Sequence, residues 1–303
     1  MLDLGYVGSV GRKFPRLFSF NQAFGPSFAG VPALGNLGGP LFPAFGDLPA
    51  PGLGSYLMES NSNSNYNSLQ ATVTKRFSYG LQMLLSYTWS HSMDDYSATP
   101  VSDITLLPGD MVNQAHNYGP SDFDRRQRFV GSFLYNLPGA YHGGSGFAKG
   151  LVNSWSVSGI VTLQSGVPFS ILGSDSLFAV TQGDLATGRT VQSAIKSGNV
   201  VDRLNAYFDT SAFVAPTADT TDFGTLGRNI IRGPKQINTD FSIFKAFSVT
   251  EAQKLEFRAE FFNLFNNVNF ANPVSVVTSG NFGQIAQTTT GPRVLQFALK
   301  YNF

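Results

Sequence analysis

Several segments of the chain alternate apolar and polar residues one by one, and the clearest is residues 254–261. Its apolar members are Leu255, Phe257, Ala259 and Phe261, and its charged members are Lys254, Glu256, Arg258 and Glu260. Because successive side chains of a strand point to opposite faces, this pattern predicts a β-strand with one apolar and one charged face. The alternative is an amphipathic helix over 254–265, in which like charges four residues apart would repel each other.

The same period recurs along the whole chain and predicts eight strands. They are expected at residues 1–9, 67–77, 81–90, 127–137, 155–165, 239–249, 254–265 and 292–303. Only a few positions interrupt the alternation, notably Leu84, Phe244 and Lys245. An all-β fold is therefore expected.

The connections between these strands alternate in length. Short connections are expected at 78–80, 138–154 and 250–253, and long ones at 10–66, 91–126, 166–238 and 266–291. Soluble domains rarely carry several loops beyond about 15 residues, whereas transmembrane barrels combine short periplasmic turns with long extracellular loops. The sequence thus predicts a transmembrane antiparallel β-barrel segment whose long loops are extracellular and whose turns are periplasmic.

A soluble β-sandwich or adhesin module would also contain alternating strands. It explains neither the regular alternation of loop lengths nor the aromatic residues near strand ends, such as Tyr87, Trp89 and Tyr301. Aromatic girdles at those positions are typical of membrane barrels.

The amino-acid composition excludes several other classes of protein. Charged residues make up 13% of the chain, against roughly 25% in a typical soluble domain. The 20 basic residues are balanced by 19 acidic ones, so no basic surface for nucleic acid is expected. The absence of cysteine excludes disulfides and thiolate metal sites. The chain also lacks an apolar run long enough for a transmembrane helix, and its 28 Phe and 11 Tyr argue against disorder.

The start of the chain lacks the basic, apolar and small-residue regions of a signal peptide. It begins within the first strand, whose outer edge would stay unpaired in lipid unless another strand covers it. Closure with eight strands leaves an interior that packed side chains just fill, while the charged residues of 254–260 favour a wet lumen. We therefore expect the C-terminal part of a larger barrel.

In order along the chain, several short motifs resemble those of TonB-dependent outer-membrane receptors of the Oar-like branch. They are LGYVGS at 4–9, NYNSLQ at 65–70, YTWS at 87–90, DFDRR at 122–126, SGVPF at 165–169, GRN at 227–229, RGP at 232–234, FFNLFN at 261–266 and the terminal Phe303. The resemblance covers residues 1–303 and implies about eight strands of a 22-stranded barrel. It also implies an N-terminal plug that binds TonB, and neither plug nor TonB box is present in this sequence. In outer-membrane proteins the barrel-assembly machinery reads the terminal strand, which here corresponds to Leu299, Tyr301 and Phe303.

Two groups of side chains are candidates for function. Lys254, Glu256, Arg258 and Glu260 are expected to face the lumen, where they would line a substrate path or hold a plug, or where charges on adjacent strands would neutralise them. The connection 91–126 is acidic and suggests extracellular loop contacts at Asp94, Asp95, Asp122 and Asp124. These acids lack the spacing of a regular calcium loop, and Asp124 is expected to pair locally with Arg125 and Arg126.

Other features point to no chemistry. His91, His116 and His142 lack metal-ligand spacing and are expected in surface loops or connections. Catalytic motifs and nucleotide-binding loops are absent from the sequence, so we expect neither an enzyme nor a cofactor. Residues 17–58 carry a single charge, Asp47, and many Gly, Pro and Phe residues, a composition that suits either a contact surface or packing against neighbouring loops.

The resemblance implies a transporter in the outer membrane of a Gram-negative cell, importing an oligosaccharide, peptide or metal complex. Its expected partners are outer-membrane lipid, the barrel-assembly machinery and, only through the absent plug, the TonB system. The first alternative is a surface adhesin or structural barrel without active transport, and a soluble carbohydrate-binding sandwich comes third.

Overall fold

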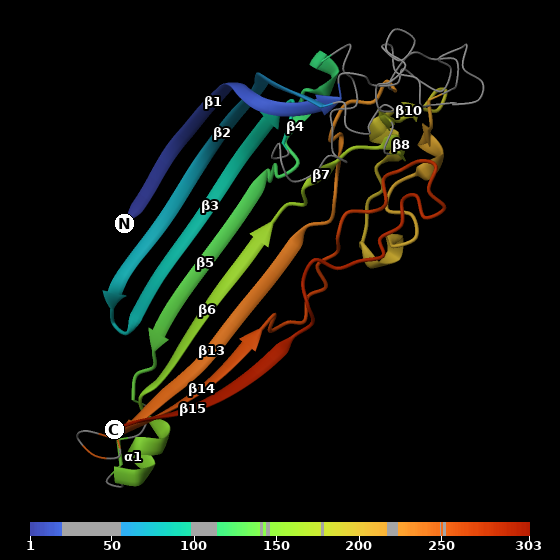
Figure 1. Cartoon of the computed structure of the whole chain (residues 1–303). Coiled ribbons are helices and arrows are strands. Elements are labelled where there is room, and N and C mark those ends of the chain that lie inside the picture. The colour runs from blue at the N-terminus through green and yellow to red at the C-terminus, as the bar shows by residue number, and fades with distance from the viewer. Residues whose placement is uncertain are drawn as a thin grey trace, which may run out of the picture.

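The computed structural model describes residues 1–19, 56–97, 114–139, 142–143, 146–176, 179–216, 224–248, 250 and 253–303. Its main feature is one antiparallel sheet in the order β1-β2-β3-β5-β6-β13-β14-β15, with the short β4 paired to β3 (Figure 1). Its strands are β1 (Leu2–Ser19), β2 (Tyr56–Ser78), β3 (Leu81–Asp94), β4 (Gly119–Pro120), β5 (Gln127–Asn136), β6 (Trp155–Gln164), β13 (Gln236–Ser248), β14 (Lys254–Phe262) and β15 (Val294–Asn302). The eight long strands are the eight expected from the sequence, and β1 and β15 lie at opposite edges of the sheet.

The strand register continues the alternation across the sheet. One row of directly opposed residues runs through Leu81, Tyr135, Val157, Ile243, Ala259 and Phe297. Another runs through Thr88, Arg128, Gln164 and Gln236. The sheet therefore has one apolar face and one polar face, which a few apolar residues such as Leu84 and Ile160 interrupt. This division suits a sheet with an apolar medium on one side and water on the other.

The short connections all lie at one end of the sheet, here called the turn end, and the long ones at the other, the loop end (Figure 1). The tightest turn joins β2 to β3 through Tyr79 and Gly80, both with positive φ (50° and 78°). Such a two-residue hairpin fits the right-handed twist of the strands. A Cβ at position 80 would lie 2.6 Å from the carbonyl oxygen of Asn136 on β5, so Gly80 also permits the close approach of that strand.

The connection 138–154 contains a helix that the sequence did not predict, α1 (Gly146–Val152). Lys245 interrupts the apolar face of β13 because it stabilises the end of this helix. Its side chain is 1% exposed, and Nζ donates to the carbonyl oxygens of Leu151, at 2.9 Å, and Asn153. The ammonium also lies 5.0 Å from the ring centroid of Trp155. Among the described residues, no helix is long and apolar enough to cross a membrane.

We expect Lys245→Met to destabilise the protein by about 1–3 kcal/mol, because both carbonyl groups would lose their buried donor. Thermal unfolding in detergent measures the loss. Lys300→Met removes an exposed lysine from β15 and is the matched control. Equal melting temperatures for the two variants would contradict the role of Lys245.

Two strands are much longer than expected, and β3 and β13 exceed their expected bounds by a few residues. β1 continues to Ser19 and β2 begins at Tyr56, so the interpretation of residues 10–66 as one long loop was wrong at both ends. Residues 60–68 are polar on both faces and show no alternation, yet they pair with β1 through Ser64 opposite Gly11 and Ser60 opposite Pro15. The helical alternative for residues 254–265 was also wrong, because residues 254–262 form β14.

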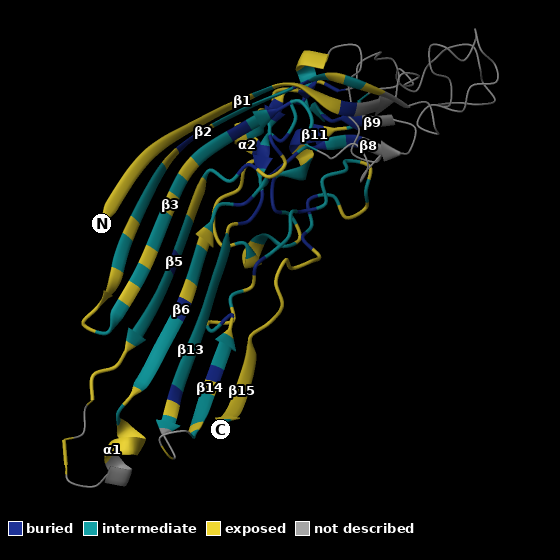
Figure 2. Cartoon of the chain, turned by 60° about the vertical axis from the view of Figure 1, so that its left-hand side comes forward, coloured by how far each residue is buried: buried dark blue, intermediate teal, exposed yellow. Residues whose placement is uncertain are grey.

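The long connections carry their own small elements at the loop end. Strand β7 (Pro168–Phe169) pairs with β12 (Ile231–Arg232), β8 (Leu172–Ser176) with β9 (Ala179–Gln182), and β10 (Asp184–Leu185) with β11 (Phe213–Val214). The helical turns are η3 (Gln114–Asn117), α2 (Val191–Ala194), η4 (Val201–Arg203) and η5 (Thr210–Ala212). Figure 2 shows that buried residues gather here rather than along the long strands.

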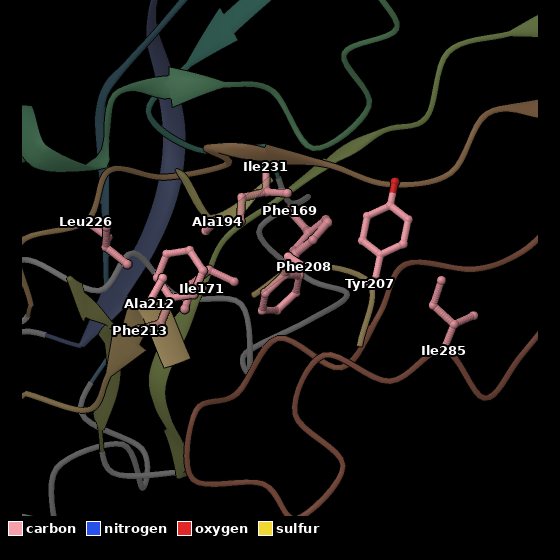
Figure 3. Close-up of a cluster of buried hydrophobic side chains, with 10 residues drawn as sticks. All are labelled: Phe169, Ile171, Ala194, Tyr207, Phe208, Ala212, Phe213, Leu226, Ile231 and Ile285. Atoms are coloured by element: carbon pink, nitrogen blue, oxygen red, sulfur yellow. The ribbon is translucent and has the colours of Figure 1, made fainter. Parts of the chain in front are cut away.

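An apolar cluster holds these loops together. The buried members drawn in Figure 3 are Phe169, Ile171, Ala194, Tyr207, Phe208, Ala212, Phe213, Leu226, Ile231 and Ile285. Phe208 is 1% exposed, with ring centroids 6.1 Å from Phe169, 5.6 Å from Phe213 and 5.2 Å from Phe282. The loops 166–238 and 266–291 therefore share one core over the end of the sheet.

Candidate functional site

A cavity of about 530 Å³ opens on the polar face of the sheet near the loop end. Four neighbouring strands line it with Tyr66 and Gln70 of β2, Thr88 and Ser90 of β3, Arg128 of β5 and Gln164 of β6. Segment 123–125, which enters β5, completes the lining. Ligand sites typically occupy 300–1,000 Å³, so the cavity has the size of a small-molecule site.

Two arginines give this cavity a positive charge. Arg125 donates from Nη1 to the carbonyl oxygen of Ser165 at 2.7 Å. Within the described part of the chain, neither Arg125 nor Arg128 forms an ion pair with an acid. Partial burial, and then the neighbouring charge of Arg128, lowers the pKa of Arg125 below its ordinary value. The cavity thus holds two guanidinium groups that no carboxylate of the described residues compensates.

Asp124 also lines the cavity, but its carboxylate is already fully engaged. Its side chain is fully buried, and Oδ2 contacts Arg232, the Nε of Arg126 at 3.2 Å and the Nδ1 of His91 at 3.4 Å. Oδ1 accepts a hydrogen bond from the backbone N–H of Ser92 at 2.8 Å. This acid therefore fixes segment 121–126 against β3 and β12, and within the part of the chain that is described its carboxylate forms no ion pair with the two cavity arginines.

A largely buried arginine, Arg228, joins the same loops. Arg228 contacts Oδ1 of Asp94 at 2.5 Å and Oδ1 of Asp122 at 2.7 Å. Burial alone would lower the pKa of Arg228, but the charges of Asp122 and Asp94 outweigh it and raise that pKa. Asn229 adds a hydrogen bond to Asp122 at 2.6 Å. The connections 95–126 and 165–235 are thus held together on either side of the segment that carries Phe123 and Arg125.

Tyr207 connects the apolar cluster to these ion pairs. It is 8% exposed, and its hydroxyl donates to the carbonyl oxygen of Arg232 at 3.0 Å. Burial raises the pKa of Tyr207, and the positive charge of Arg203 opposes this only in part.

This pKa shift predicts a loss of stability in alkali. The unfolded tyrosine ionises at about pH 10, before the folded one, so the contribution of Tyr207 is complete below that pH. It is lost as the pH rises towards the folded-state pKa. We expect the unfolding free energy, measured against pH, to fall less steeply above about pH 10 in Tyr207→Phe. The exposed Tyr118 provides the control, Tyr118→Phe, and an unchanged slope in Tyr207→Phe would refute the prediction.

The charged residues of β14 lie on the polar face, outside the lining of this cavity. Arg258 is 2.7 Å from Oε1 of Glu256 and 3.7 Å from Oε1 of Glu260, so these charges compensate each other within one strand. Lys254 lies opposite Asn302 of β15.

The structure brings the four acids expected as loop contacts to one region, in unlike roles. Asp94 lies in β3 and is buried against Arg228, and Asp95 accepts from the backbone N–H of Asn63 at 3.0 Å. Asp122 is half exposed and pairs with Arg228. Asp124 is the only one of the four that lines the cavity. Their carboxylates thus hold the protein's own loops.

Several expectations about this region need correction. Asp124 pairs with Arg126 as expected and also with the distant Arg232, whereas Arg125 donates to the carbonyl oxygen of Ser165 instead of pairing with Asp124. His91 belongs to β3 rather than to a loop and contacts Asp124, whereas His116 lies in η3, inside the connection in which it was expected. Within the described ranges, no group of three or more His, Cys, Asp or Glu residues could hold a metal ion.

Two expectations fall wholly or partly outside the described residues. They concern the weakly charged stretch, of which 20–55 is not described, and the acidic connection 91–126, of which 98–113 is not described.

The terminal strand presents its aromatic residues outward. Leu299 and Tyr301 lie on the apolar face of β15, and Phe303 follows at the chain end with 95% exposure. The rings of Tyr301 and Phe303 stack with centroids 5.9 Å apart.

Sequence reasoning singled out Asp124 but missed most of the other residues that form the site. Arg228 and Arg232 belong to the GRN and RGP motifs, but nothing in the sequence showed that they reach acids more than 100 positions away. Arg128 and Tyr66 appear as ordinary polar-face residues. One signal could have identified them. Charged residues are rare in this chain, so an arginine on a strand needs an explanation.

Comparison with known proteins gives one match. A family model described as an outer membrane beta barrel domain matches residues 1–296. No curated protein and no solved structure matches the chain. Barrels of this kind are typically non-enzymatic, in keeping with a site that offers binding groups.

Proposed function

This chain belongs to the outer membrane β-barrel domain family, its place is therefore the outer membrane, and we propose that it is part of a TonB-dependent, Oar-like transporter. In that proposal it supplies about eight strands of a 22-stranded barrel. A plug domain outside this chain would occupy the lumen and connect it to TonB. The imported substrate would be an oligosaccharide, peptide or metal complex.

The observation that supports transport is the position of the cavity. It lies on the polar face and close to the loop end, where residues of four strands and one loop segment converge. In a barrel whose apolar face meets lipid, the polar face lines the lumen. A site there lies on the route of a solute that enters between the extracellular loops, and the β14 charges would line a later part of that route.

An adhesin is the second candidate, because the loops 166–238 and 266–291 form a packed layer with its own core. A rigid layer of this kind suits stable contact with a surface. Adhesion requires no energy from the inner membrane, and this difference separates the two functions.

TonB dependence tests the proposal directly. Cells that carry the gene, cells that lack it and cells that lack TonB would be compared for uptake of radiolabelled oligosaccharides, peptides and metal chelates. Transport predicts that the same substrate fails to accumulate in both mutants. Surface binding that needs the gene but not TonB would overturn transport in favour of adhesion.

We further propose that Leu299, Tyr301 and Phe303 form the signal for the barrel-assembly machinery. Deletion of Phe303 is expected to lower the amount of heat-modifiable protein in outer-membrane fractions severalfold, because the exposed terminal ring would no longer be recognised. Phe265→Ala removes another exposed ring, 69% exposed, as a control. Normal assembly after deletion of Phe303 would exclude the signal.

A further inference from the structure

We propose that the cavity on the polar face binds an anionic saccharide, with Arg125 and Arg128 holding its carboxylate and Tyr66 and Phe123 contacting the faces of its sugar rings. This inference rests on the proposed import function and specifies the class of substrate.

The charge of the site is the first argument. Arg125 and Arg128 both line the cavity, and the described residues offer neither of them an acidic partner. Asp124, the acid nearest in sequence, is occupied by Arg232, Arg126 and His91. Like charges brought together in this way repel each other, and an anion between them would relieve the repulsion. Guanidinium groups bind carboxylates through two parallel hydrogen bonds, which also fix the orientation of the ligand.

The rest of the lining favours a sugar over a simple anion. Thr88 and Ser90 offer hydroxyl groups, and Gln70 and Gln164 offer amides. Hydroxyl groups donate and accept, and amides do both through separate atoms, so they match the many hydroxyls of a saccharide. Phe123 is 62% exposed at the rim, and an exposed ring beside a polar cavity provides an apolar surface for the C–H face of a sugar.

The construction of the site indicates that it is prepared before the ligand arrives. The hydroxyl of Ser90 donates to the carbonyl oxygen of Arg125 at 2.9 Å, and Asp124 holds the backbone of Ser92. The side chain of Gln164 is oriented by a hydrogen bond to Gln236 at 2.7 Å. Groups fixed in this way lose little conformational entropy on binding.

The test measures binding of a galacturonic acid trisaccharide to the intact outer-membrane protein purified in detergent. Isothermal titration calorimetry would compare this ligand with its methyl ester, which keeps the rings and hydroxyls but lacks the charge. We expect the ester to bind more weakly by about tenfold to a hundredfold, the range for hydrogen bonds to charged groups. We also expect affinity to fall with added salt, because the site is open to solvent.

Variants assign the effect to the cavity. Arg128→Gln is expected to weaken binding of the acid as much as esterification does, and to leave binding of the ester unchanged. Arg128→Lys keeps the charge without the planar fork and should fall between the two. Arg189→Gln removes an arginine from the loop layer outside the cavity and is the matched control. The heat-modifiable gel band verifies that each variant is assembled, and the comparison of acid with ester in the wild type needs no variant.

Equal affinity for the acid and its ester, or undiminished binding in Arg128→Gln, would overturn the proposal. Stronger binding of inorganic phosphate than of the trisaccharide would also overturn it, in favour of a phosphate site. None of these measurements involves TonB. A protein that binds the acid but imports nothing through TonB would refute the transport function alone, while TonB-dependent uptake of an uncharged substrate only would refute this inference alone.

Discussion

Replacing Arg228 by methionine should cost about 3–5 kcal/mol of local stability, since removing one member of a buried ion pair leaves the other charge without compensation. The side chains of Arg228 and Asp94 are 13% and 5% exposed. Among the described residues, only Ser97 would then still donate hydrogen bonds to the carboxylate of Asp94. Hydrogen exchange of the amides in the connections 114–126 and 224–232 measures the loss, and it reads these loops separately from the barrel strands.

Two further variants show whether charge causes this loss. In Arg228→Met/Asp94→Asn the uncompensated charge is absent, so part of the protection should return. Arg189→Met removes a half-exposed arginine whose partner Asp209 lies 3.5 Å away, and exposed pairs contribute roughly 0–1 kcal/mol. If Arg228→Met and Arg189→Met exchanged at equal rates, the bridge would have no structural role.

Phe208→Ala should be almost as damaging, with an expected loss of about 3–5 kcal/mol for a buried phenylalanine. Phe208 contacts aromatic rings from both loops that form the apolar cluster, since Phe169 and Phe213 belong to 166–238 and Phe282 to 266–291. Its removal would leave a hole at the point where the two loops meet. Limited proteolysis should then cut both loops, while the strands of the sheet remain protected.

The exposed Phe265 gives the matched control, because Phe265→Ala deletes the same ring from a position with 69% exposure. Its proteolysis pattern should equal that of the wild type. Phe208→Leu should lie between Phe208→Ala and the wild type, since it fills more of the space. A Phe208→Ala protein as resistant as Phe265→Ala would show that the loops do not depend on their shared core.

The strands could be predicted because each of them is two-faced, and a period of two then appears directly in the sequence. Prediction failed in segments that do not separate an apolar face from a polar face, because no period of two appears there. Residues 60–68 are polar on both sides, and their pairing with β1 depends on backbone hydrogen bonds that every residue can make. Lys245 broke the pattern for a reason that lies outside its strand, in the carbonyl groups at the end of α1.

The site was harder to predict than the sheet. The sequence singled out the acids of 91–126 as a group, but Arg228, which contacts Asp94 and Asp122, and Arg232, which contacts Asp124, lie over 100 positions later. The alternation of apolar and polar residues describes side chains along one strand. It contains no information on which loops meet above the sheet. The cavity arginines became visible only when register placed Arg128 beside Thr88 and Gln164.

The length of the β1–β2 hairpin has a consequence for the reach of the protein. β2 has 23 residues and spans about 75 Å at roughly 3.3 Å per residue, whereas a tilted strand crosses a bilayer in about 9–11 residues. More than half of the hairpin must therefore stand in water, which explains why its serine- and asparagine-rich part needs no apolar face. Register shifts between Gly11 and Pro15 bend this ribbon across the loop end (Figure 1). In the proposed barrel the loop end is extracellular, so an antibody against the far part of the ribbon should bind intact cells.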